Sequence, residues 1–236
     1  MVFTKEKFRL ALDNIVDTLK NTPETTGVLF FGSVQRGDEK DNSDIDLYAV
    51  VSCNECWNYK KYISGVLTEV YFAPADKWKE SIENGHVITI KAFAGGTVLF
   101  ERDNEVSELI ELAKRQWENG PKPLTPIQIN NWRIKLTEYI QDIECLPEDG
   151  YQCRLLCGIA VPSALEAFCA LNGIWPEKPE RIIDCIGKYD AKLSRMAREF
   201  YESNERGISW AIKIIDHVIQ PFGGRLIEYE GPRISS

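Results

Sequence analysis

Two aspartates, Asp44 and Asp46, stand two positions apart at the start of an apolar run that continues to Val51. In an extended strand, side chains two positions apart point to the same face, so the two carboxylates are expected to lie close together. Like charges this close repel one another unless a cation lies between them, and Mg²⁺ prefers hard oxygen ligands of this kind. Taken alone, so short a motif is more often a polar strand entry exposed to water.

The segment upstream strengthens the metal interpretation. Gly32 and Ser33 directly follow the apolar, strand-like run Gly27–Phe31, and Arg36 comes three positions after Ser33. A glycine at this place lets backbone N–H groups approach an anion closely, and a serine hydroxyl adds a donor for a phosphate oxygen. A strand, a phosphate-type turn and a second strand that opens with two carboxylates therefore follow one another within residues 27–46.

A third carboxylate would complete the site. Glu69 is the only acid in the strand-like run Val66–Phe72. If this run pairs antiparallel with residues 45–51, Glu69 lies beside Asp44 and Asp46. A charged side chain inside an apolar strand is costly to bury unless it has a partner or a metal ion. The alternative is that Glu69 faces solvent on an edge strand, since glutamates are mostly exposed.

Together these residues resemble a known family. The chain contains the pattern Gly32-Ser33-x-x-Arg36-Gly37 followed by Ser43-Asp44-Ile45-Asp46-Leu47. This pattern resembles that of the nucleotidyltransferase superfamily related to DNA polymerase β. The third acid, in Thr68-Glu69-Val70, looks closest to bacterial antibiotic nucleotidyltransferases such as the streptomycin and kanamycin (aminoglycoside) adenylyltransferases. The resemblance covers residues 27–102.

The resemblance implies a role for each of these residues. Asp44 and Asp46 would bind two catalytic Mg²⁺ ions, and Glu69 would be the third ligand or the general base. Gly32 and Ser33 would hold the β- and γ-phosphates of a nucleoside triphosphate, most simply ATP. The last of the candidate residues, Arg36, would contact a phosphate.

The implied reaction is attack by an acceptor hydroxyl on the α-phosphorus of ATP, with transfer of AMP and release of pyrophosphate. An aminoglycoside-like antibiotic is the best-known type of acceptor. Two alternatives remain open: a protein hydroxyl as the acceptor, as in antitoxin-like relatives, and a nucleotide-binding module without turnover. The sequence does not identify the acceptor, the preferred base or the oligomeric state.

Composition limits the partners and the compartment. The formal net charge of −8 and a pI near 5.0 argue against a broad nucleic-acid surface, because phosphate backbones are bound largely by Lys and Arg. Seven cysteines and a start without a signal-peptide pattern predict a reduced, cytoplasmic protein whose thiols are free rather than bound to zinc. No membrane span is expected, since the most apolar stretch, residues 158–175, is interrupted by Pro162, Glu166 and Asn172.

Hydrophobic periodicity predicts an α+β fold with two domains. Residues 1–120 are expected to form the catalytic nucleotidyltransferase domain around a small mixed sheet, and residues 121–236 an α-helical, acceptor-binding bundle. The Gly120–Pro126 segment is the predicted linker, with Thr125 and Pro126 opening the first helix of the bundle. We expect the active site in a cleft between the two domains.

The expected elements follow from the same patterns. Strands are expected at 27–31, 45–51, 66–72 and 97–100. Helices are expected at 4–20 with Thr4 as N-cap, 54–64, 74–83 and 105–117, and after the linker at 126–145, 150–172, 177–187, 189–203 and 204–220.

Overall fold

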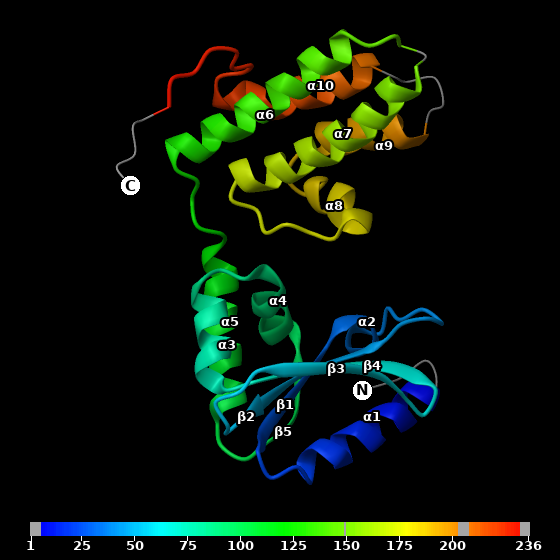
Figure 1. The fold of residues 1–236 in the computed structure, drawn as a ribbon, viewed down its shortest axis with the longest axis vertical. Coiled ribbons are helices and arrows are strands. Elements are labelled where there is room, and N and C mark those ends of the chain that lie inside the picture. The colour runs from blue at the N-terminus through cyan, green and yellow to red at the C-terminus, as the bar shows by residue number, and fades with distance from the viewer. Residues whose placement is uncertain (1–5, 149, 203–207, 232–236) are drawn as a thin grey trace. The chain divides into compact units, whose positions relative to one another are not determined.

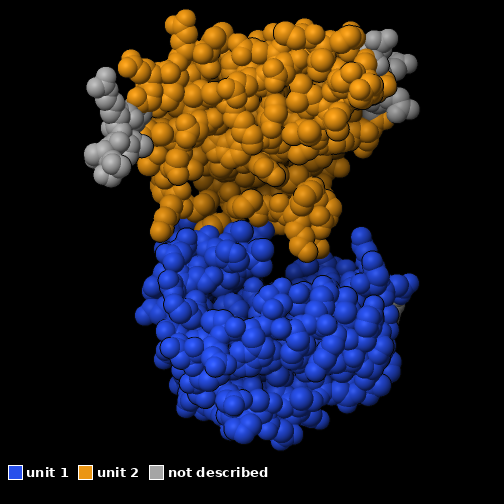
Figure 2. Space-filling model, viewed as in Figure 1, with its two compact units in different colours: residues 1–120 blue, residues 121–236 orange. Residues whose placement is uncertain are grey.

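The chain forms two compact units, unit 1 at residues 1–120 and unit 2 at residues 121–236 (Figure 2). The computed structural model describes residues 6–148, 150–202 and 208–231. The boundary between the units falls at Gly120–Pro121, inside the stretch whose prolines and glycine interrupt the helical pattern.

Unit 1 is built on a mixed five-stranded sheet with the strand order β3-β4-β2-β1-β5. The strands are β1 (Thr25–Phe31), β2 (Ile45–Val51), β3 (Trp57–Ile63), β4 (Val66–Ala73) and β5 (Thr97–Glu101). β2 and β4 are parallel, and the other neighbouring pairs are antiparallel. The predicted α+β class with a small mixed sheet is confirmed.

The expected helix at residues 54–64 is wrong, because Trp57–Ile63 forms strand β3. Ser64 and Gly65 have φ values of 49° and 79°, and Ile63 pairs directly with Val66 across them. Two successive positive φ angles are the signature of a tight two-residue hairpin turn. The Ser64-Gly65 pair and the aromatic residues of β3 favour a β-hairpin in the sequence. They are stronger evidence than the weak helical periodicity of residues 54–64.

The expected antiparallel pairing of residues 66–72 with 45–51 is also wrong. β4 runs parallel to β2, with Asp46 opposite Glu69 in the register. The chain reverses once between β2 and β3 and again at Ser64–Gly65, so that β4 returns to the direction of β2. The unrecognised strand β3 thus accounts for both errors. The sheet places β4 between β2 and β3, so Glu69 is not on an edge strand.

Helices cover both faces of this sheet. The helices of unit 1 are α1 (Glu6–Lys20), α2 (Gly32–Arg36), α3 (Ala75–Glu83), α4 (Val87–Gly95) and α5 (Glu105–Asn119). α1 lies along one face (Figure 1) and buries Phe8, Leu12 and Ile15 in the apolar cluster that side chains of β1, β2 and β4 form on that face. The N-cap predicted at Thr4 lies outside the described residues.

The other face of the sheet carries the even-numbered side chains of β2, Asp46, Tyr48 and Val50. Tyr48 stacks on Trp78 of α3, with ring centroids 4.3 Å apart, and also contacts Phe93 of α4. α4 was not predicted because its sequence is mostly apolar and lacks the separate polar and apolar faces of an amphipathic helix. His86 begins it, since its side chain accepts a hydrogen bond from the Thr89 N–H.

Unit 2 is entirely helical in its described part. Its elements are α6 (Pro126–Glu144), α7 (Tyr151–Leu171), α8 (Pro179–Ile186), α9 (Ala191–Glu202), α10 (Ile208–Ile219) and the 3₁₀ turn η1 (Gln220–Phe222). Thr125 and Gln128 form a capping box at the start of α6, where Thr-Pro predicted a helix start. The core includes Leu136, Ile140 and Ile214, all fully buried.

α7 is the one helix in the described ranges that is long and apolar enough to cross a membrane by length and composition. Half of its most apolar window is buried inside the unit, as in the core helix of a globular bundle. Cys153 and Cys157 lie one turn apart on it, with their sulfur atoms 3.9 Å apart. Burial and the neighbouring Cys153 raise the pKa of the Cys157 thiol to about 12, and none of the seven cysteines is in a disulfide.

Candidate active site

One row of residues crosses four strands of the sheet and defines the site. Phe31 of β1 lies opposite Asp46 of β2, Asp46 lies opposite Glu69 of β4, and Glu69 lies opposite Lys60 of β3. Residues opposite one another in a sheet project to the same face. The strand register alone therefore brings two acids and one base together on the face that also carries Tyr48.

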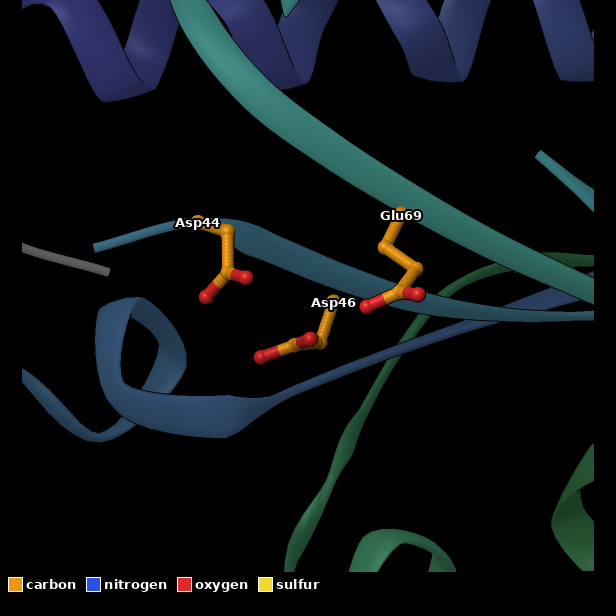
Figure 3. A group of neighbouring side chains, drawn as sticks. All are labelled: Asp44, Asp46 and Glu69. Atoms are coloured by element: carbon orange, nitrogen blue, oxygen red, sulfur yellow. The ribbon is translucent and has the colours of Figure 1, made fainter. Parts of the chain in front are cut away.

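Asp44 joins this row from the residue before β2. One carboxylate oxygen each of Asp44, Asp46 and Glu69 lies within 4.8 Å of the others. Figure 3 shows the three side chains leaving β2 and β4 toward the same side of the sheet, with the acidic groups close to one another. The side chains of Asp44 and Glu69 are 34% and 18% exposed, so solvent reaches the group while the sheet holds it.

The strand that ends at Phe31 places Gly32 directly against Asp46. A Cβ atom added at Gly32 would lie 2.1 Å from Asp46 Oδ2, a distance that real structures essentially never show. Gly32 also has a φ of 91°, in the region that favours glycine. Only a glycine at this position leaves the Asp46 carboxylate where it is.

Ser33 and Arg36 lie on the single turn of helix α2 that follows. Ser33 and Ser43 are hydrogen-bonded through their hydroxyls at 3.2 Å, so Ser33 is tied to the residue before Asp44. Arg36 Nη2 lies 3.3 Å from Asp38 Oδ1, and the Arg36 side chain is 45% exposed. Within the described part of the chain, Arg36 makes no ion pair with the three acids. Of the six candidate residues, Arg36 is the one that the structure does not tie to the acidic group.

Sequence reasoning missed two residues of the site. Lys60 Nζ lies 3.4 Å from Glu69 Oε2 and 3.6 Å from Asp44 Oδ2. The hydrogen bond to Glu69, followed by the Glu69 charge, raises the pKa of the Lys60 ammonium group. This residue could have been found only by placing residues 57–63 on a strand, since a helix sends every side chain in a different direction.

Tyr71 is the second missed residue. Its hydroxyl donates a hydrogen bond to Glu69 Oε1 at 2.8 Å, and this bond to the carboxylate is the main reason that the pKa of Tyr71 is raised. Tyr71 follows Glu69 by two positions on β4, so both side chains project to one face. One oxygen of Glu69 is thus held by a phenol and the other by an ammonium group, which fixes the plane of the carboxylate.

The donor set fits a divalent metal. Three carboxylates on neighbouring, rigidly paired strands offer hard oxygen ligands, and hard cations such as Mg²⁺ bind such groups together with phosphate oxygens. Gly32 has no side chain, and this leaves the space that the Asp46 carboxylate occupies. In the described residues no other group of three His, Cys, Asp or Glu side chains is placed so closely.

Comparison with known proteins gives the class of domain. Residues 13–105 match the family model described as "Polymerase beta, Nucleotidyltransferase", and this range includes all six candidate residues. The chain is also similar to the crystal structure of a nucleotidyltransferase-like protein from Exiguobacterium sibiricum 255-15, with 17% identity, a TM-score of 0.53, and coverage of 91% of this chain and 75% of that one. No curated protein matches the chain.

The family-model match supports the nucleotidyltransferase superfamily, which the sequence pattern resembles, for residues 13–105. It supports nucleotidyl transfer as the general activity of such a domain. At 17% identity the similarity to the solved structure shows the fold alone.

Proposed function

We propose that this protein is a Mg²⁺-dependent nucleotidyltransferase that moves AMP from ATP to the hydroxyl of a small-molecule acceptor and releases pyrophosphate. The observation that carries the proposal is the convergence of Asp44, Asp46 and Glu69, with oxygens within 4.8 Å of one another, beside the turn that begins at Gly32. Polar side chains that converge in this way on a domain of this class are the usual mark of the reacting centre.

In this reaction Asp44 and Asp46 would hold the metal, two ions in the arrangement that the family resemblance implies. Bound Mg²⁺ would supply positive charge to the triphosphate and lower the pKa of the acceptor hydroxyl. Gly32 and Ser33 would position the β- and γ-phosphates. The Ser33 hydroxyl is already hydrogen-bonded to the hydroxyl of Ser43, the residue before Asp44. Arg36 would reach a phosphate only by giving up its pair with Asp38.

Glu69 is proposed as the residue that orients the acceptor and accepts its proton. Its Oε1 atom accepts a hydrogen bond from Tyr71, and its Oε2 atom lies 3.4 Å from Lys60 Nζ, so Oε2 would accept a hydroxyl proton once that ammonium group moves away. A positioned carboxylate of this kind contributes about 10²–10⁴-fold to a rate as general base. We assign the rest of the acceleration to alignment of the two substrates and to charge stabilisation.

The proposed acceptor is an aminoglycoside-like antibiotic, bound with the help of the helical unit 2. What supports this is the Thr68-Glu69-Val70 pattern, which resembles the antibiotic adenylyltransferases. The protein would work in a reducing compartment such as the cytoplasm, since none of its seven cysteines is in a disulfide and two of them, Cys56 and Cys145, are exposed.

The test is incubation of the full chain with α-labelled ATP, Mg²⁺ and a panel of acceptors, with Asp46→Asn as the matched inactive control. Pyrophosphate release that rises with an aminoglycoside and disappears in Asp46→Asn supports the proposal. Label that appears only on a protein points to the antitoxin-like alternative. Binding of ATP without release, in the wild type and the variant alike, points to a nucleotide-binding module and overturns the proposal.

A further inference from the structure

Lys60 is a cation that the sheet places beside two of the three acids. It stands on the edge strand β3, directly opposite Glu69, and its ammonium group lies within 3.6 Å of both Glu69 and Asp44. Two of the three carboxylates therefore already share one positive charge. The cross-strand register places the Lys60 side chain on the face that carries the acids.

The neighbouring lysine shows that the placement is specific. Lys61 follows Lys60 on the same strand, so its side chain projects to the opposite face. Its ammonium group lies over the ring of Tyr59, 4.2 Å from the centroid. Two adjacent lysines of equal length thus have different partners, an aromatic ring on one face and the acidic group on the other.

We propose that Lys60 is the built-in counter-cation of this group, and that a divalent ion must displace its ammonium group from Asp44 to bind the acidic group. The inference rests on the proposed function, because it concerns the same metal site. Three carboxylates held close together repel one another, and one ammonium group offsets part of that repulsion in the metal-free protein. A divalent ion bound to the same oxygens would be repelled by the ammonium group.

Displacement is feasible because the pair is partly exposed. The Lys60 side chain is 46% exposed, and an ion pair in contact with water holds its partners weakly. A lysine has a flexible four-carbon stem, so its head group can move away without any change in the strand. Lys60 is therefore expected to weaken metal binding by the nucleotide-free protein. The phosphates of an incoming nucleotide would give the displaced ammonium group a new partner.

The experiment measures Mn²⁺ binding to the nucleotide-free full chain by the loss of the free-ion EPR signal, at low ionic strength. The variants are Lys60→Gln, Lys60→Arg and Asp46→Asn, with Lys61→Gln as the matched control. Removing the positive charge from residue 60 should lower the Kd for Mn²⁺ about fivefold to tenfold. Lys60→Arg and Lys61→Gln should bind as the wild type does. Circular dichroism checks that each variant is folded.

The outcomes separate this inference from the proposed function. If Asp46→Asn loses Mn²⁺ while Lys60→Gln binds it no more tightly than the wild type, the metal site stands and the role of Lys60 is refuted. If Lys61→Gln tightens binding as much as Lys60→Gln, the effect is one of net charge and the role is refuted as well. If Asp46→Asn binds Mn²⁺ as the wild type does, the three acids are not the metal site and the proposed function itself fails.

Discussion

The α-carbon of Gly32 lies so close to the Asp46 carboxylate that a single added methyl group would sit 2.1 Å from Asp46 Oδ2. The residue that follows β1 thus packs directly against the second residue of β2 at the centre of the site. This contact explains, in steric terms, why a glycine precedes the serine in the motif. A larger residue would need a different position for the acid.

Gly32→Ala is expected to reduce nucleotide transfer at least 100-fold, because the alanine Cβ must push the Asp46 carboxylate out of the acidic group. Gly37→Ala is the matched control. Gly37 also has a positive φ, 77°, but a Cβ added there meets nothing within 4 Å. Both variants should lose about 1 kcal/mol of stability from the strained backbone, and only Gly32→Ala should lose activity. Thermal unfolding and initial rates measured side by side check this; equal rates in the two variants would contradict it.

The two aspartates are expected to be essential for activity and dispensable for folding. Asp44→Asn and Asp46→Asn keep the size of each side chain and remove the charge that binds a divalent ion. We expect transfer to fall by at least 10³-fold in each, since electrostatic stabilisation of this kind is usually the largest part of such catalysis. The measurement is transfer in a Mg²⁺ assay, together with near-ultraviolet circular dichroism. Near wild-type transfer by Asp46→Asn would count decisively against the mechanism.

Much of this site followed from sequence, because strand geometry is local. The alternation of acids and apolar residues from Asp44 to Val51 was enough to place Asp44 and Asp46 on one face. The convergence of Glu69 with them was expected for a wrong reason, an antiparallel pairing. It occurs in a parallel pair because residues directly opposite each other share a face in either arrangement.

Lys60 and Tyr71 could not be found in the same way. The role of Lys60 depends on β3 being a strand at the edge of the sheet, and that depends on the two-residue turn at Ser64–Gly65. Tyr71 was assigned to a strand, but its hydrogen bond to Glu69 is set by side-chain packing and has no sequence pattern. Both side chains reach Glu69 through contacts of the folded sheet, which the local sequence does not specify.

Tyr71→Phe is expected to lower the turnover rate about fivefold to tenfold while leaving the fold intact. The substitution removes the hydroxyl that donates to Glu69 Oε1 at 2.8 Å, so the carboxylate loses one of the two contacts that fix its plane. KM for ATP should change little, because Tyr71 acts through Glu69 rather than on the nucleotide. Tyr62→Phe, at a tyrosine that is 74% exposed, is the control and should behave as the wild type. A Tyr71→Phe enzyme with unchanged turnover would show that Glu69 needs no such support.

The last prediction concerns the stability of unit 2 and its dependence on pH. Asp190 Oδ1 accepts a hydrogen bond from the Leu193 N–H at the start of α9, and Asp190 Oδ2 lies 2.7 Å from His217 Nε2 of α10. Burial alone would raise the pKa of Asp190, but these hydrogen bonds outweigh it and lower the pKa below its usual value. The carboxylate form is therefore favoured in the folded state.

Because the pKa is lower in the folded state, Asp190 stabilises the fold fully above its ordinary pKa of about 4. That contribution is lost as the pH falls through the lowered pKa of the folded state. At pH 7, Asp190→Ala should cost about 1–2 kcal/mol, since it removes a helix cap and a charged hydrogen bond. Asp190→Asn should cost less, because asparagine still caps a helix.

Urea unfolding at pH 7 and at pH 3 tests this, and the difference between the wild type and Asp190→Ala should shrink at the lower pH. Asp184→Asn is the control. Asp184 pairs with Arg198, but its side chain is 68% exposed, so its loss should change stability little at either pH. If Asp190→Ala and Asp184→Asn destabilise the protein equally at pH 7, the Asp190–His217 contact does not link α9 to α10 in the way that the geometry indicates.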